Sequence, residues 1–357
     1  MSLHRDTYAE INLKYLKENI ETTYKKFKRP LMAVIKADAY GHGYREVATY
    51  IKDIEYLEMF AVATLPEAIE LRELGITKGI LILGAVPTSK EEIDLAIKYD
   101  ISLTMISLDY MHHLETLIDQ QPLKIHIKLD TGMHRIGLTS KAQLDEMLNT
   151  IDYNKFILEG IFTHYATADG EQAAFDQQRE LFYDLVADHK FKYIHCCNSA
   201  AMAYHQDNKS NLGRIGIVMY GIDPAGNESD CYKQVMSLFT RVSMVKKIKA
   251  GSRVGYGLTY TAKQDEYLAT LPIGYADGII RKNQGRKVYI NGKYFEIVGR
   301  VCMDQMMVRV DESVKVGDEV EIFGDHISLA SMAKDLDTIP YEIICLISKR
   351  VERIYIK

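Results

Sequence analysis

Short apolar runs recur along the first part of the chain, separated by segments with helical spacing. The first, "PLMAVIK", follows a segment from Leu13 to Phe27 that reads as a helix. The later runs are "FAVAT" from Phe60, "GILILGA" from Gly79, "SLTMIS" from Ser102, "LKIHIKLD" from Leu123, "LEGIFTHYA" from Leu158, "YIHCCNSA" from Tyr193, and a weaker one over 211–217. Alternating strands and helices imply parallel strands, and about eight units in roughly 200 residues favour a closed (β/α)8 TIM barrel. An open doubly wound sheet is the alternative.

Turn and cap residues separate these elements. In "LPEAIELRELG", Pro66 suits the first turn of a helix and Gly75 suits its end. In "TSKEEIDLAIKYD", Thr88 and Glu91 have the spacing of a capping box. Both segments are therefore predicted to be helices between strands.

The pattern changes near "GIDPAGNESDCYK", where Gly, Pro, Asn, Ser and Asp cluster as in a linker. Strand-like runs follow, namely "RVSMVKKI", "EYLATLPIG", "KVYINGKYFEIVG", "MMVRV" and "DEVEIF". Asn291 and Gly292 between two of them are a strong hairpin signal. We expect a barrel over residues 1–228 and a mainly β C-terminal domain over 229–357. Roughly the first ten residues could instead pair with the C-terminal domain.

Composition and charge narrow the function classes. The net charge of −5 and pI near 6.1 provide no general attraction to nucleic acid or to anionic lipid. The amino terminus lacks the apolar core of a signal peptide, and no run of about eighteen apolar residues occurs. We expect a cytoplasmic protein without a membrane segment in this chain. The sequence leaves open that the chain is a fragment of a longer, membrane-anchored protein.

The cysteines indicate neither a disulfide framework nor a metal site. The chain has five of them, an odd number, and no C-x-x-C pair. We expect reduced thiols, mostly in the core, and no bound metal.

Polar residues end several of the apolar runs. Chemistry in such barrels lies at the carboxyl ends of the strands, so these residues would share one site. They are Lys36, Lys128, Asp130, His164, Asn198, Ser199 and Arg214. Any one of them could instead merely solvate a strand end.

A phosphate site is the second chemical indication. Barrels commonly hold phosphate with the loops after strands seven and eight, where Ser199 and Gly216 lie here. Gly216 could also be an ordinary turn glycine. A phosphate with Lys36 across the barrel mouth suggests a phosphorylated cofactor that forms a Schiff base with the lysine.

Eight motifs in series resemble one known family. They are "AVIKADAYGHG", "KLDTGMHRIGL", "THYATAD", "CCNSA", "RIGIVMYG", "VGYG", "LPIGYADG" and "VCMDQMMV". Together they resemble the pyridoxal-phosphate-dependent alanine racemases of bacteria. The resemblance implies a barrel followed by a β domain, and a homodimer whose subunits complete each other's active sites. It also implies an isomerase that interconverts L- and D-alanine for peptidoglycan.

The resemblance also implies roles for residues around the cofactor. Lys36 would hold pyridoxal 5'-phosphate and act as one base, and Tyr256 of the partner subunit would be the second. Arg214 would face the pyridine nitrogen, and His164 would belong to the environment that stabilises the Tyr256 phenolate. The phosphate would be bound by the hydroxyls of Tyr40 and Ser199 and by the backbone of Gly216 and Ile217.

Other positions match the family's substrate site. Arg135 would lie near the substrate carboxylate, and Lys128 matches a lysine that is carbamylated in many members. The partner's Tyr275, Met303 and Asp304 would line the entrance and the carboxylate site. Met303 could equally be an ordinary core methionine.

The chain departs from the family pattern at two positions, and other functions compete. Lys349 stands where well-known members have a tyrosine, and His134 replaces a common glycine. A serine or broad-specificity racemase of the same family is therefore the main alternative.

Two functions from other classes also compete. A pyridoxal-phosphate-binding module would lack the second domain. A barrel-type decarboxylase would bring a cysteine-centred substrate loop and a glycine-rich phosphate loop, and neither is found here. A non-enzymatic scaffold is the general alternative.

Overall fold

A computed structural model describes residues 5–86 and 89–357. They form two compact units, each described here by itself. The barrel unit comprises Asn19–Ala39 and Tyr44–Met219. The sheet unit comprises the described residues up to Glu18, Tyr40–Gly43 and Tyr220–Lys357.

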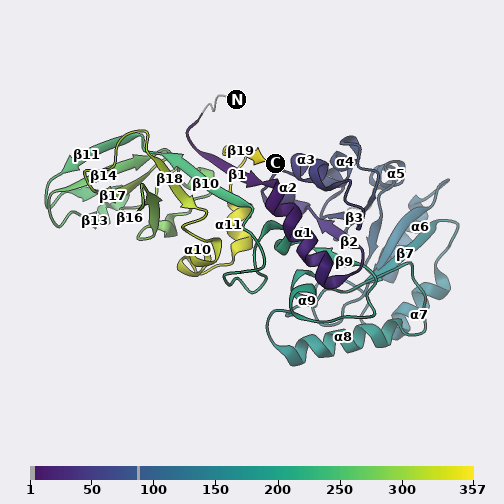
Figure 1. The fold of residues 1–357 in the computed structure, drawn as a ribbon. Coiled ribbons are helices and arrows are strands. Elements are labelled where there is room, and N and C mark those ends of the chain that lie inside the picture. The colour runs from purple at the N-terminus through teal and green to yellow at the C-terminus, as the bar shows by residue number, and fades with distance from the viewer. Residues whose placement is uncertain (1–4, 87–88) are drawn as a thin grey trace. The chain divides into compact units, whose positions relative to one another are not determined.

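Eight parallel strands form the centre of the barrel unit (Figure 1). They are β2 (Leu31–Val34), β3 (Leu57–Val62), β4 (Gly79–Ile82), β5 (Leu103–Met105), β6 (Leu123–Lys128), β7 (Phe156–Phe162), β8 (Tyr193–His195) and β9 (Gly213–Ile215). Two four-stranded sheets, β4-β3-β2-β9 and β5-β6-β7-β8, meet through a parallel bridge between Leu81 and Ser102. On the other side, Arg214 N–H donates to the Cys197 carbonyl at 2.9 Å. The predicted closed barrel is confirmed.

Helical segments precede and connect the strands, and the longer ones bury one face each. They are α1 (Leu13–Phe27), α2 (Lys36–Tyr40), α3 (Tyr44–Ile51), α4 (Leu65–Glu73), α5 (Lys90–Lys98), α6 (Leu108–Leu117), α7 (Lys141–Thr150), α8 (Gln172–Val186) and α9 (Ser199–Tyr204). The segment α2 is a left-handed turn rather than a regular helix. Helix α8, for example, buries Phe175, Phe182 and Leu185 at helical spacing. The capping box of α5 joins Ser89 and Glu92, so the predicted box with Glu91 is wrong by one residue. Its other predicted member, Thr88, lies outside the described residues.

The sheet unit contains a nine-stranded sheet in the order β11-β14-β17-β16-β15-β18-β10-β1-β19. Strand β1 pairs antiparallel with β10 and parallel with β19. These strands are β1 (Tyr8–Asn12), β10 (Met236–Arg241), β11 (Met244–Ile248), β14 (Glu266–Leu271), β15 (Lys287–Ile290), β16 (Lys293–Ile297), β17 (Met306–Val310), β18 (Glu319–Phe323) and β19 (Glu352–Ile356). A two-stranded sheet, β12 (Arg253–Val254) with β13 (Tyr260–Thr261), and helices α10 (Leu329–Leu336) and α11 (Pro340–Leu346) complete the unit.

The predicted hairpin joins β15 and β16. Asn291 and Gly292 have φ values of 48° and 85°. A two-residue turn with positive φ at both positions matches the right-handed twist of its strands, which is why Asn-Gly is favoured there.

The cysteines do not all lie where we expected. Cys196 and Cys197 are buried, Cys302 is half-buried, and Cys231 and Cys345 are exposed. The expectation that most thiols lie in the core is wrong, because only Cys196 and Cys197, which directly follow β8, are buried. Within the part of the chain that the structure describes, no helix is both long enough and apolar enough to cross a bilayer.

Candidate active site

A left-handed turn follows Lys36 at the carboxyl end of β2. Ala37, Asp38, Ala39 and Tyr40 all have φ between 52° and 55°. Left-handed conformation costs roughly 1–2 kcal/mol for each residue with a Cβ atom, and such strain concentrates at functional sites. Glu67 of α4 accepts a hydrogen bond from Ala37 N–H at 2.6 Å and so helps to hold the turn.

The Arg214 guanidinium is buried and fixed by three backbone carbonyls at the ends of two strands, β7 and β8. Its Nη2 donates to the Thr163 carbonyl at 2.7 Å and to the Cys196 carbonyl at 3.3 Å. Its Nη1 donates to the carbonyl of His195 and to Nδ1 of the same residue, the latter at 2.9 Å. These partners leave the guanidinium little freedom to move.

A pair of buried histidines extends this network into the barrel. Because Arg214 donates to His195 Nδ1, the proton of His195 lies on Nε2, which faces His126 Nδ1 at 2.9 Å. His126 Nε2 in turn lies 3.7 Å from Glu159 Oε2. Gly160 makes room for the pair, since a Cβ atom there would lie 2.5 Å from His126 Nδ1. Burial lowers the pKa of both histidines, although Glu159 opposes the shift at His126.

His164 is a neutral side chain among cations. Burial first, then the charges of Arg214, Arg135, Lys128 and Lys36, lower its pKa well below the usual value. The positive charge of this site therefore comes from lysine and arginine rather than from His164. The lysine and arginine charges that act on this neutral ring make the carboxyl ends of the strands attractive to a small anion.

Lys128 carries an amine that loses its proton easily. Burial and the nearby Arg214 lower its pKa to about 7, with a smaller effect of Arg135, while Asp130 opposes the shift. Its Nζ donates to the Leu129 carbonyl at 2.6 Å. Near neutral pH, a large fraction of this amine is therefore uncharged and nucleophilic.

The turn before Arg135 is fixed by Asp130. Its Oδ1 accepts hydrogen bonds from the N–H groups of Gly132 and His134, at 3.1 and 2.9 Å. Burial raises the pKa of Asp130, but these two bonds and Lys128 lower it more, so the carboxylate stays ionised. His134 has a φ of 54°, a conformation that explains why glycine is common at this position in the resembling family.

Two of the predicted phosphate-binding residues, Ser199 and Gly216, meet at the ends of β8 and β9. Ser199 Oγ accepts a hydrogen bond from Gly216 N–H at 2.9 Å. Because the serine hydroxyl is the acceptor here, its own proton can be donated to an anion. Ile217 begins the adjoining 3-10 helix, Ile217–Tyr220.

The remaining predicted residues lie in the sheet unit. Tyr40 packs near Tyr220 and Tyr341, with ring centroids 4.9 and 6.4 Å away. Burial raises the pKa of Tyr40, so its hydroxyl remains a protonated donor. Lys349 is exposed in the turn between α11 and β19, beside Arg350, which binds Asp304 Oδ1 at 2.7 Å.

Tyr256, Tyr275 and Met303 gather along one segment, 299–304. Tyr275 N–H donates to the Cys302 carbonyl at 3.0 Å, and a Cβ atom added at Gly257 would lie 2.6 Å from Arg300 Nη1. Gly255 and Gly257, on either side of Tyr256, have φ values of 74° and 71°, which residues with a Cβ atom rarely adopt. The Tyr256 side chain is 71% exposed, so the Gly255–Gly257 turn presents the Tyr256 phenol to the outside of the unit.

Sequence reasoning missed the residues that position Arg214. Thr163, His195 and His126 lie within or directly after buried strands, whereas the predicted site contains only polar residues that end the apolar runs. Two histidines inside the apolar runs "LKIHIKLD" and "YIHCCNSA" were the available signal, because a buried imidazole needs partners.

The buried histidines predict a loss of stability in weak acid. Their pKa values are lowered in the folded state, so below the usual 6.5 the unfolded chain binds more protons and stability falls as the pH falls. Each histidine contributes up to about 1.4 kcal/mol per pH unit. Urea unfolding at pH 7.5 and 5.5 measures the effect. In His164→Asn, the free energy of unfolding should fall less between pH 7.5 and pH 5.5 than in the unmodified chain. An equal fall in both proteins would contradict the assignment of a neutral buried His164.

Comparisons with known proteins agree over almost the whole chain. A family model described as the alanine racemase N-terminal domain matches residues 11–224, and one described as the C-terminal domain matches residues 235–355. An alanine racemase of Ligilactobacillus salivarius is 44% identical, covering 99% of this chain and 98% of the relative. The crystal structure of alanine racemase from E. faecalis has a TM-score of 0.94 at 38% identity and full coverage of both chains. The Bacillus anthracis enzyme with bound L-Ala-P has a TM-score of 0.92 at 36% identity, covering 100% of this chain and 96% of the other.

Proposed function

The chain belongs to the alanine racemase family, and from that membership we propose that it interconverts L-alanine and D-alanine with pyridoxal 5'-phosphate as cofactor. The observation that carries the proposal is the buried Arg214 guanidinium at the carboxyl ends of the strands, where its Nη2 lies 3.4 Å from Nδ1 of the neutral His164 and where the charges of Lys36 and Arg135 also act. We further propose that the enzyme is a cytoplasmic homodimer that supplies D-alanine for peptidoglycan.

The residues of the barrel unit fit this cofactor. The cations at the strand ends suit its phosphate and the substrate carboxylate, and Ser199, whose Oγ accepts the Gly216 N–H, offers a hydroxyl proton at the same end of the barrel. We assign the covalent anchor to Lys36, and further phosphate contacts to Tyr40 and Ile217. When bound, pyridoxal phosphate supplies an electron sink that acidifies the α-hydrogen of an amino acid.

Inversion at the α-carbon needs a proton removed from one face and another delivered to the opposite face. We assign one face to the Lys36 amine, which can act as a general base in its neutral form. The other face belongs to Tyr256 of the partner subunit. A phenol of ordinary pKa, about 10, is a weak base at neutral pH, so the cations around His164 would have to stabilise its anion.

The exposure of Tyr256 supports a second copy of the chain as its working partner. Tyr275 and Met303 beside it are 42% and 52% exposed, although both are large and apolar. Large exposed apolar groups gathered in one place often mark an interface. We assign Tyr275, Met303 and Asp304 to the entrance and carboxylate site of the partner's barrel.

Arg214 would keep the cofactor's pyridine nitrogen without a full proton, because a guanidinium stays charged. Arg214→Glu should raise transamination relative to racemisation, measured as pyruvate against D-alanine formed from L-alanine.

The same substitution should also lower stability, because the glutamate carboxylate would face the carbonyls of Thr163, His195 and Cys196. We expect a loss of about 3–5 kcal/mol in the free energy of unfolding. Arg214→Lys, which keeps the charge, is the matched control, and an unchanged product ratio in folded Arg214→Glu would contradict the electronic role.

The pKa of Lys128, about 7, makes it suited to reaction with CO2, because only an uncharged amine attacks the CO2 carbon, forming the carbamate and releasing one proton. We propose that Lys128 is carbamylated and that the resulting anion positions Arg135. Protein equilibrated with 13C-bicarbonate near neutral pH should show one carbamate resonance by NMR. The resonance should disappear in Lys128→Met and persist in Lys124→Met, an adjacent lysine on the same strand. Its persistence in Lys128→Met would place the carbamate elsewhere.

Alanine is favoured over serine as substrate because the matched relatives are named alanine racemases. The test is a chiral assay of purified protein with pyridoxal phosphate, in which L-alanine and L-serine are supplied separately. D-alanine should form faster than D-serine. Faster D-serine formation would favour the serine alternative and make Lys349 the first residue to examine, by Lys349→Tyr. Retention of the cofactor without any racemisation would favour a binding module.

A further inference from the structure

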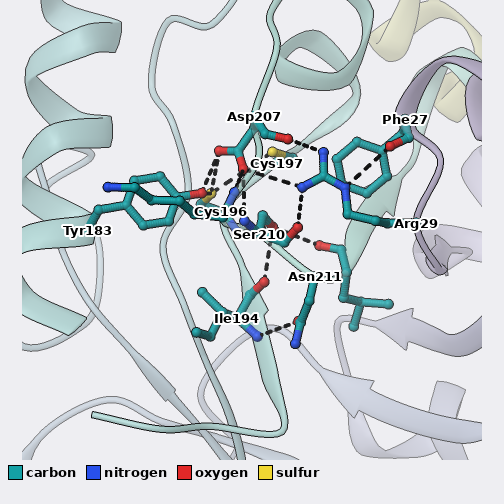
Figure 2. A network of polar contacts seen from close by, with 11 residues as sticks. Phe27, Arg29, Tyr183, Ile194, Cys196, Cys197, Asp207, Ser210 and Asn211 are labelled. Atoms are coloured by element: carbon teal, nitrogen blue, oxygen red, sulfur yellow. Dashed lines mark hydrogen bonds and ion pairs between the residues drawn. The ribbon is translucent and has the colours of Figure 1, made fainter. Parts of the chain in front are cut away.

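A cluster of metal-binding groups lies in the barrel unit apart from the residues assigned to catalysis. Cys196 and Cys197 directly follow β8, and Asp207 belongs to the loop between α9 and β9 (Figure 2). Both cysteines are buried, with side chains at most 1% exposed. Their Sγ atoms lie 4.0 Å apart, and Cys196 Sγ lies 3.6 Å from Asp207 Oδ2.

These separations suit a single tetrahedral cation. With Zn–S bonds of about 2.3 Å and a Zn–O bond of about 2.0 Å, tetrahedral angles place two sulfurs about 3.8 Å apart and a sulfur and an oxygen about 3.5 Å apart. The three ligand atoms of Cys196, Cys197 and Asp207 all lie within 4.8 Å of one another. A cation could therefore bind with small side-chain rotations.

The Asp207 carboxylate is held in the orientation that such a site needs. Its Oδ1 accepts hydrogen bonds from the N–H groups of Lys209 and Ser210, at 3.0 and 2.8 Å. Arg29 Nη1 lies 3.6 Å from the same oxygen. Oδ2 is thereby turned toward the thiols, where it accepts a hydrogen bond from the Tyr183 hydroxyl (Figure 2). Contacts of this kind to the outer oxygen are typical of metal-binding carboxylates.

A second, independent observation marks the same place. The Tyr165 side chain is 2% exposed, and its hydroxyl makes no hydrogen bond of good geometry among the described residues, only a weaker contact with Cys196. It lies near enough to Cys196, Cys197 and Asp207 to interact with them electrostatically. A buried hydroxyl is rarely left unsatisfied, and a bound cation, or water bound to it, would satisfy this one.

We propose that Cys196, Cys197 and Asp207 bind one thiophilic divalent cation of the Zn²⁺ class. On binding, two metal–sulfur bonds and one metal–oxygen bond form, the two thiol protons pass to solvent, and no group is oxidised. The fourth position belongs to a water molecule or to the Tyr165 hydroxyl. Two thiolates and a carboxylate would leave the complex with one negative charge, which Arg29 balances.

The site would act on the position of Arg214 rather than on the reaction. The Cys197 carbonyl accepts Arg214 N–H at 2.9 Å, and the Cys196 carbonyl accepts Arg214 Nη2 at 3.3 Å. A cation held by both side chains would tie the Asp207 loop to the strand end that fixes this guanidinium. The absence of a C-x-x-C pair led us to expect no metal, but here adjacent cysteines and a carboxylate from a later loop replace that motif.

The test uses Co²⁺ as a spectroscopic substitute for Zn²⁺ in the cofactor-loaded, chelator-treated protein. Titration should produce the visible bands of tetrahedral, thiolate-bound Co²⁺, saturating at one ion per chain, and Zn²⁺ should abolish them. The bands should be lost in Cys196→Ala and in Cys197→Ala. Asp207→Asn keeps the acceptor for Lys209 and Ser210 but removes the anionic ligand, so Co²⁺ affinity should fall about tenfold or more.

The exposed thiols supply the matched control. Cys231→Ser/Cys345→Ser should retain the full signal. Bands that vanish in this control, bands that persist in both alanine variants, or no bands in the unmodified chain would each overturn the proposal. Thermal unfolding of every variant, followed by circular dichroism, identifies any that fail to fold. Because the readout is metal absorbance, its failure is distinct from a failure of racemisation.

Discussion

Replacing Lys36 by alanine should abolish racemisation in both directions. In our account the Lys36 amine both anchors the cofactor and moves a proton at one face of the α-carbon. General-base groups contribute about 10²–10⁴-fold, and loss of the covalent anchor adds to this, so we expect a loss of at least about 10³-fold. The assay is the formation of D-alanine from L-alanine, and of L-alanine from D-alanine, at saturating pyridoxal phosphate.

Lys36→Arg is the matched control for charge. Arginine retains the cation at the end of β2, but it is not deprotonated at neutral pH and cannot replace the amine in either role. It should therefore be as inactive as Lys36→Ala while folding at least as well. Substantial activity in either variant, with unfolding transitions like that of the unmodified chain, would contradict the role of Lys36.

Replacing Tyr256 by phenylalanine should stop racemisation but preserve one half of the proton chemistry. In one of the two enantiomers of alanine the α-hydrogen points toward the Lys36 amine. Lys36 could still exchange that hydrogen with solvent. In D2O, one enantiomer of alanine should gain deuterium without inversion, while the other should exchange far more slowly. We expect racemisation to fall about 10²–10⁴-fold. Equal loss of exchange for both enantiomers would contradict a two-base division of labour.

The same substitution should leave stability almost unchanged. The Tyr256 side chain is 71% exposed within its own chain, so the hydroxyl contributes little to folding. Tyr294→Phe is a suitable control, because Tyr294 is an exposed tyrosine of the same unit, at 53% exposure, and lies outside the segment 299–304. It should retain full activity.

The barrel was predictable because its signals are local. Each strand is a short apolar run buried on both faces, as β2 is at all four positions from Leu31 to Val34, and turn residues separate the runs. The partners and register of β1 in the large sheet were not predictable in this way, although we expected that roughly the first ten residues could pair with the C-terminal domain. Strand β1 is half polar, with alternating burial, and its partners β10 and β19 lie more than two hundred residues away, at pairs such as Tyr8 with Phe239 and with Glu352.

The charged residues of the candidate site were predictable from the sequence, but the residues that hold them in position were not. Lys36, Lys128, His164 and Arg214 are visible as polar residues at strand ends, Arg135 is implied by the family resemblance, and the charges of these lysines and arginines act on His164. Their supports depend on contacts far apart in the sequence, and no local pattern announces such contacts. The left-handed turn after Lys36, for example, is held by a carboxylate of another helix.

The protonation of His164 shows the same limit. A histidine near a proposed phenolate invites a cationic role from sequence alone. In the folded chain, burial and the surrounding lysines and arginines instead keep its pKa low, and the positive charge belongs to those neighbours. Only the packed structure shows how the charge is distributed between these groups.

The deuterium content of the first D-alanine formed from L-alanine in D2O tests the central claim most directly. If Lys36 removes or delivers the proton on one face and Tyr256 of the partner subunit does so on the other, the product proton comes from a different base. The earliest D-alanine should then carry deuterium almost completely. Product that retains the original hydrogen would mean that a single group transferred it across the α-carbon, and would contradict the two-base account.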